Sequence, residues 1–140
     1  MKEEVPITLK TAHTKTARLE LKKHNLVYVY TNENCVIEMD EVKTIHKALF
    51  EMVKGQPCYL IVFPAAGSTS TGEARQYAAK SKNEKNIMAE AVVVNNLALR
   101  ILASFYANIN QPKHKVKLFS SSHSAVNWIS DLMKKNEHLI

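Results

Sequence analysis

The chain has few of the residues on which many recognisable sites depend. Its 140 residues include three glycines, two cysteines and one tryptophan. Glycine-rich turns form most phosphate and dinucleotide loops, yet neither G-x-x-x-x-G-K-[ST] nor G-x-G-x-x-G occurs, and no G-x-S-x-G elbow is present. Gly67 and Gly72 have the spacing of the two glycines in G-x-x-x-x-G-K-[ST], but Glu73 stands where that motif needs a lysine. We therefore predict that the protein is not an enzyme and takes no cofactor.

Cysteine and histidine are also arranged without a metal-site pattern. Cys35 and Cys58 lie far apart in apolar contexts, which favours buried free thiols in a reducing compartment. The six histidines show neither H-x-x-x-H nor H-x-H spacing, and no acidic cluster accompanies them. This pattern predicts that the protein holds no metal.

Long apolar runs are absent too. No stretch approaches the roughly 18–20 apolar residues that a membrane span needs. The N-terminal residues 1–16 carry early acids and no apolar segment, unlike a secretory signal. We expect a cytoplasmic protein without a membrane span.

The net charge of +6 raises the question of nucleic-acid binding. The lysines, however, are scattered in ones and twos, and no basic run is interleaved with aromatic residues. A solvated basic surface explains this pattern better than a nucleic-acid interface does.

Strand and helix patterns alternate along the chain. Residues 1–16 show no clear periodicity and predict an N-terminal arm. Alternating or continuous apolar runs predict strands at 18–22, 26–30, 58–63, 88–94 and 115–119. Helical spacing predicts helices at 40–53, 72–81 and 97–108 and a last helix that opens at 120–122.

This order predicts a single α/β domain over residues 17–140. It begins with a β-hairpin and continues in β-α units, which give a mainly parallel sheet of about five strands with four helices. Asp40 is expected to cap the first helix, and Gly55 is expected to end it.

A hydroxyl-rich loop connects the buried strand 58–63 to the next helix. It contains Ser68, Thr69, Ser70 and Thr71. At the carboxyl edge of a parallel sheet, where ligands tend to bind, such a loop has three interpretations. It can cap the helix through a capping box from Ser70 to Glu73, it can hold an anion, or it can be phosphorylated.

The predicted helix 97–108 is unusually apolar. Its polar residues form one thin stripe, Asn96, Arg100, Ser104 and Asn108, and apolar side chains cover the rest. A helix on a sheet needs only about 100° of apolar face. The helix is therefore deeply buried, or it presents Leu99, Leu102, Phe105 and Tyr106 to a partner, to a second copy or to an apolar ligand.

The ordered set of segments resembles STAS domains, the anti-sigma-factor-antagonist fold, and in particular stand-alone STAS-like proteins grouped with SEC14-type names. The resemblance covers roughly residues 17–135. It rests on three segments: 36–42 before the first helix, 72–77 at the start of the second, and the closing strand 116–119 followed by 125–129.

In regulatory STAS domains this loop carries Asp-Ser-Ser-Gly, and its second serine is phosphorylated by an anti-sigma kinase. The matching positions here are Thr69-Ser70-Thr71-Gly72. The resemblance implies Thr71 as the acceptor and Ser70 as its neighbour, although Thr69 replaces the aspartate. It implies no enzyme.

Two functions follow as predictions. The first is a non-catalytic regulatory or protein-interaction module, switched by phosphorylation in the loop, with a kinase-like or anti-sigma-like partner or a second copy of the chain. The alternative is a carrier that binds a small apolar or lipid-like ligand.

Overall fold

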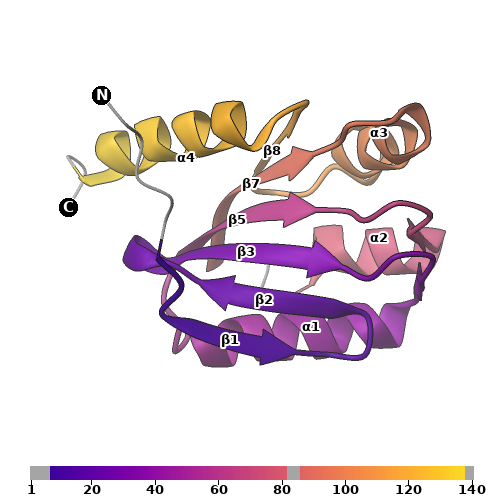
Figure 1. The fold of residues 1–140 in the computed structure, drawn as a ribbon, viewed down its shortest axis with the longest axis horizontal. Helices are drawn as coiled ribbons and strands as arrows, with labels where there is room; N and C mark the ends of the chain where they lie inside the picture. Colours follow the sequence, from indigo (N-terminus) through magenta and orange to yellow (C-terminus); the bar gives the residue numbers. More distant parts are fainter. Residues whose placement is uncertain (1–6, 82–85, 138–140) are drawn as a thin grey trace.

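The fold is built on one mixed sheet. The computed structural model describes residues 7–81 and 86–137. Across the main sheet the strands follow the order β1 (Lys10–His13), β2 (Ala17–Leu21), β3 (Leu26–Thr31), β5 (Cys58–Phe63), β7 (Ile87–Val93) and β8 (Lys115–Phe119). The first three are antiparallel, and β3, β5, β7 and β8 are parallel (Figure 1). The predicted α/β class is confirmed, with a main sheet of six strands instead of about five.

The additional strand lies in the predicted arm. β1 pairs with β2 from Lys10 opposite Leu21 to His13 opposite Arg18. Three of its four residues are exposed, so this edge strand has no apolar alternation that a sequence pattern would reveal. Residues 1–6 of the arm, 82–85 of the polar link and 138–140 at the end lie outside the described residues, and the domain boundary at residue 17 stays a prediction.

Helices cover both faces of the sheet (Figure 1). α1 (Met39–Met52), α2 (Gly72–Lys80), α3 (Leu97–Ser104) and the π-helix η3 (Phe105–Asn110) lie on one face, and α4 (Ser122–Glu137) lies on the other. On the first face, Leu49 of α1 packs against Val27 and Leu60. On the second, Ile129 of α4 packs against Tyr59 and Ile61.

The middle strand β5 is buried from both sides, as its unbroken apolar sequence predicts. Leu60 and Ile61 point to opposite faces, and they are 6% and 0% exposed. Cys58, at the start of the strand, is fully buried. Cys35 is only partly covered, so the prediction of two buried thiols is right for Cys58 and wrong for Cys35.

The ends of two helices differ from the predictions. Glu38, not Asp40, is the N-cap of α1, because Glu38 and Glu41 form a reciprocal capping box in which the Glu38 N–H donates to Glu41 Oε2 at 3.1 Å. The stop predicted at Gly55 lies one residue earlier, because Lys54, with a φ of +55°, directly follows the C-cap Val53. Gly55 comes next with a φ of +71°, and its N–H donates to the Phe50 carbonyl oxygen at 2.9 Å. The helix predicted over 97–108 is α-helical only to Ser104 and continues as the π-helix η3 to Asn110.

Three short elements, two strands and one single-turn helix, were not predicted as such. β4 (Val36–Ile37) and β6 (Thr69–Ser70) form a separate two-stranded parallel sheet. A three-residue helix η1 (Lys23–Asn25) makes the turn of the predicted hairpin, with His24 and Asn25 at positive φ. β4 and β6 bring the segment before α1 against the hydroxyl loop.

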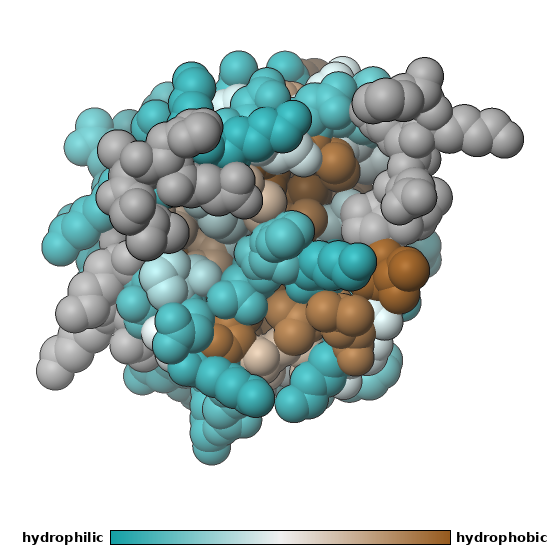
Figure 2. Space-filling model, turned by 90° about the vertical axis from the view of Figure 1, so that its left-hand side faces the viewer, coloured by the Kyte–Doolittle hydropathy of each residue, from teal (hydrophilic) through white to brown (hydrophobic). Residues whose placement is uncertain are grey.

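Most of the face seen from the left-hand end of Figure 1 is hydrophilic, and apolar side chains gather toward its lower right (Figure 2). Ile7 and Leu9, which precede β1, are 70% and 58% exposed. None of the helices in the described part of the chain is long and apolar enough to cross a bilayer.

Candidate functional site

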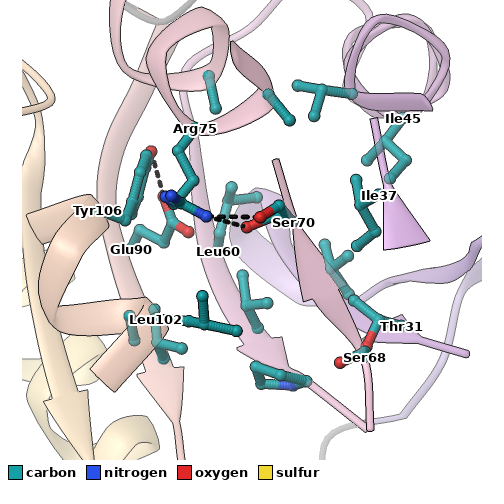
Figure 3. A pocket seen from close by; sticks show the side chains of 18 of the residues that line it. Thr31, Ile37, Ile45, Leu60, Ser68, Ser70, Arg75, Glu90, Leu102 and Tyr106 are labelled. Carbon is teal, nitrogen blue, oxygen red and sulfur yellow. Dashed lines mark hydrogen bonds between the residues drawn. The ribbon is translucent and has the colours of Figure 1, made fainter. Parts of the chain in front are cut away.

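A cavity of about 210 Å³ lies between the first face of the sheet and the helices α1, α2 and α3. We call it the loop cavity, because Ser68, Thr69 and Ser70 of the hydroxyl loop form part of its wall. Its floor comes from β3, β5 and β7, and most of its lining is aliphatic. Arg75 lies between Ser70 and Glu90 on one side of the cavity, and Ile37 and Ile45 line the opposite side (Figure 3). The polar side chains of Thr31 and Ser68 lie on the same side as Ile37.

Backbone hydrogen bonds hold the hydroxyl loop in place. The N–H groups of Thr69 and Thr71 donate to the carbonyl oxygens of Cys35 and Ile37 at 2.9 and 3.1 Å. Gly67 has a φ of +74°, and a Cβ atom there would lie 2.0 Å from Asn34 Oδ1. A larger residue would have to adopt this left-handed conformation and displace the Asn34 side chain, so the position favours glycine. The loop is a fixed wall of the cavity.

The four predicted loop hydroxyls have different surroundings. Ser68 is buried, and its hydroxyl donates to the Ala65 carbonyl at 2.7 Å. Thr69 is exposed. Thr71 is the N-cap of α2, since its Oγ1 accepts the N–H of Ala74 at 3.0 Å. The predicted capping box from Ser70 to Glu73 is therefore wrong, because the N-cap lies one residue later in the chain.

Ser70 faces Arg75 instead. Nη1 of Arg75 donates to the carbonyl oxygen of Ser70 at 2.6 Å and to its Oγ at 3.1 Å. Nε of Arg75 is buried, and no described residue accepts a hydrogen bond from it. The guanidinium group is thus anchored through one nitrogen, while another of its donors lacks an acceptor.

A second polar group rises from the floor of the cavity. Glu90 in β7 is 9% exposed. Its Oε1 accepts hydrogen bonds from Tyr106 Oη at 3.2 Å and from His114 Nε2 at 2.8 Å. These bonds connect β7 to η3 and to the segment before β8.

The apolar helix residues divide between two surfaces. Leu99, Leu102 and Tyr106 line the loop cavity, whereas Phe105 is 43% exposed. Phe105 belongs to an outward stripe that we call the outer stripe, with side chains spaced by four residues. It consists of Leu97, Ile101, Phe105 and Ile109, which are 43–74% exposed.

Sequence reasoning missed Arg75, Glu90 and His114. Glu90 could have been found from the sequence, because it is a single carboxylate inside an otherwise apolar strand, and such a group needs a buried partner. No sequence pattern points to Arg75 or His114, since their roles depend on contacts with residues far away in the chain. In the described residues no group of three or more His, Cys, Asp or Glu side chains is placed to hold a metal ion.

Comparisons with known proteins show the family of this chain and a solved structure with a similar fold. Residues 19–133 match a family described as a domain of unknown function, DUF7793. The chain belongs to the DUF7793 family. No curated protein matches it.

Among solved structures, this DUF7793 member is similar to the crystal structure of an uncharacterized protein from the DUF3478 family with a SpoIIAA-like fold, from Shewanella loihica PV-4. The identity is 9%, the match covers 91% of this chain and 98% of that chain, and the TM-score is 0.54. At this identity the likeness shows the fold alone. It supports the STAS-like fold, while the narrower SEC14-type branch stays a prediction.

Proposed function

We propose that this protein is a regulatory binding module that takes up a small, mostly apolar molecule in the loop cavity. The observation that carries this proposal is the cavity itself, with mostly aliphatic walls and a few polar side chains, Ser70, Arg75 and Glu90 among them. Such an arrangement is typical of small-molecule sites, where apolar walls provide affinity and a few polar groups fix orientation. We infer no catalysis.

The position of the hydroxyl loop supports a regulatory role. Its outer side carries Thr69 and the start of α2, and its inner side lines the cavity. A ligand that contacts Ser70 or Arg75 therefore touches residues adjoining the surface that we predict to bind a partner. A ligand in the loop cavity can change the affinity of the protein for its partner only if the partner binds the filled and the empty protein differently.

A substitution that fills the cavity tests this function. Ala74 is fully buried and lines the loop cavity. Ala74→Leu adds three carbons, and at about 0.8 kcal/mol per buried methylene it stabilises the fold by up to ~2 kcal/mol if the space is empty. Gln76→Leu is the matched control, because Gln76 is exposed on the same helix.

The probes are indole, hexanol, benzoate and octanoate, and binding is followed by amide chemical shifts. We expect shifts around Leu60 and Leu102 in the native protein and in Gln76→Leu, and none in Ala74→Leu. If no probe shifts these residues, or if the shifts persist in Ala74→Leu, the loop cavity is not a ligand site.

A phosphorylation switch is the second candidate. Thr69 is exposed in the loop, and Thr71 stands at the N-terminus of α2, where the helix dipole stabilises a phosphate. Mass spectrometry of the protein purified from its native cells tests this directly. Phosphate on Thr69, Ser70 or Thr71 supports the switch, and its absence under all growth conditions refutes it.

The outer stripe supports the prediction of a protein partner or a second copy. Four large apolar side chains in a row are exposed on α3 and η3. Light scattering of the native chain and of Ile101→Glu decides between a dimer and a monomer. Only the loss of a native dimer in the variant supports self-association through this stripe.

A further inference from the structure

The guanidinium group of Arg75, which lines the loop cavity, has one buried hydrogen-bond donor without an acceptor among the described residues. An arginine side chain has five N–H donors in a flat fork. Nη1 is held by Ser70, whereas the buried Nε has no acceptor among the described residues. Nε and Nη2 form the side of the fork whose spacing matches the two oxygens of a carboxylate.

An unpaired buried donor is a cost that folded proteins usually avoid. Arg75 is not free to turn away, because Nη1 is fixed to both the carbonyl and the hydroxyl oxygen of Ser70. An acceptor brought in by a ligand satisfies Nε without disturbing these bonds. The apolar walls beside Arg75, including Leu60 and Leu102, strengthen such a charge-assisted bond by excluding water.

From this geometry we propose that the ligand of the loop cavity is a compact monocarboxylic acid. Its carboxylate binds Nε and Nη2 of Arg75, and its apolar body lies toward Ile37 and Ile45 on the opposite side (Figure 3). This inference rests on the proposed function and adds the chemical class of the ligand.

Glu90 limits the ligand to one negative charge. Its carboxylate lies at the same cavity, and Oε1 is occupied by Tyr106 and His114. A dicarboxylate or a phosphate dianion would bring additional negative charge close to Glu90 and would be repelled. A single carboxylate on Arg75 neutralises the one cationic side chain that lines the cavity next to Ser70.

The volume of the cavity limits the size of the ligand. A cavity of about 150 Å³ is sufficient for benzene, and drug-sized ligands need roughly 300 Å³ or more. At about 210 Å³ the loop cavity fits an acid from the size of benzoate to that of octanoate. Long-chain fatty acids are too large.

The experiment compares each acid with its neutral amide. Benzoate, hexanoate and octanoate are titrated at pH 7 beside benzamide, hexanamide and octanamide, and dissociation constants are taken from amide chemical shifts. We expect each acid to bind at least tenfold more tightly than its amide. Arg75→Gln should remove this preference, and Arg75→Lys should reduce it, because lysine keeps the charge but lacks the fork.

Arg100→Gln is the matched control. Arg100 is exposed on α3 and is not among the residues that line the cavity, so its removal lowers the net charge equally. It should leave the preference for acids unchanged. If Arg100→Gln and Arg75→Gln weaken acid binding equally, the attraction is a general effect of surface charge, and the inference is wrong.

The remaining outcomes separate this inference from the proposed function. If acids and amides bind equally and Ala74→Leu blocks both, the cavity is a ligand site but the carboxylate assignment is wrong. If neither class binds, both fail. If Arg75→Gln does not fold, an unchanged acid preference in Arg75→Lys overturns the assignment, and a reduced one supports it.

Discussion

The pair of Glu90 and His114 should make a large contribution to stability, and His114→Leu tests it. The two side chains are joined at 2.8 Å and are 11% and 2% exposed. Removing one partner of a buried hydrogen-bonded pair costs about 1–3 kcal/mol, and more when the remaining group is charged, because that group is left without its partner. Tyr106 still donates to the same oxygen at 3.2 Å, and the cavity lets water approach. We therefore expect a loss of about 2–3 kcal/mol.

Urea unfolding followed by far-ultraviolet circular dichroism measures this loss as a lower midpoint at unchanged slope. For a chain of this length the loss corresponds to a fall in Tm of roughly 7–11 °C. His13→Leu is the control, since His13 is exposed on β1 and should change stability by less than about 0.5 kcal/mol. Amide exchange in η3 and around residue 114 should accelerate in His114→Leu before it does in β3.

The double variant Glu90→Leu/His114→Leu makes the test sharper. Replacing both members of a buried pair by apolar groups is often close to neutral, whereas removing one is not. The double variant should therefore be more stable than His114→Leu alone. A loss below 0.5 kcal/mol in His114→Leu, or a double variant that is less stable than the single one, would refute the reasoning.

Two further predictions concern the loop and the thiols. Gly67→Ala should destabilise the protein by about 2 kcal/mol or more, and Gly55→Ala by only about 1 kcal/mol, because both have positive φ but only Gly67 has Asn34 in the way; equal midpoints in urea would contradict this. In native protein a thiol reagent should modify the partly exposed Cys35 and not Cys58, and in urea it should modify both. Burial, with a contribution from the charge of Glu90, raises the pKa of Cys58 to about 12. Since this pKa is above its unfolded value near 8.5, the contribution of the protonated thiol is complete below about pH 8.5 and is lost as the pH rises toward 12. The free energy of unfolding should therefore fall less steeply between about pH 8.5 and 12 in Cys58→Ala than in Cys35→Ala. Equal slopes in the two variants would contradict the raised pKa of Cys58.

Much of the fold could be predicted because local patterns and core burial agree. The unbroken apolar run 58–63 predicts a strand covered on both faces, and β5 has that burial. The apolar helix predicts that Leu99, Leu102 and Tyr106 are covered by something, and all three line the cavity. Their role as a ligand or partner surface stays a prediction. The prediction did not separate them from Phe105, since a helix that is apolar almost all round does not indicate which side faces the sheet.

The remaining features depend on contacts between segments far apart in the chain. β1 is an exposed edge strand, and it exists because its backbone pairs with β2 rather than because of an apolar pattern. The N-cap of α2 is Thr71 and not Ser70, because Thr71 is itself extended and its N–H donates to the Ile37 carbonyl oxygen, so that the helix begins only at Gly72. A propensity argument has no access to either partner strand.

The sequence alone was sufficient for the class of fold, the approximate order of its elements and the position of a hydroxyl loop before the second helix, because hydrophobic periodicity and helix-end residues are local. It also excluded the common glycine-rich nucleotide loops, since these need particular residues at fixed spacing. Only the tertiary structure showed that Arg75 lies against Ser70 and that His114 and Tyr106 meet Glu90. Glu90 and His114 are 24 residues apart, and the parallel pairing of β7 with β8, in which Ala89 lies opposite Lys115, brings them together rather than any local preference.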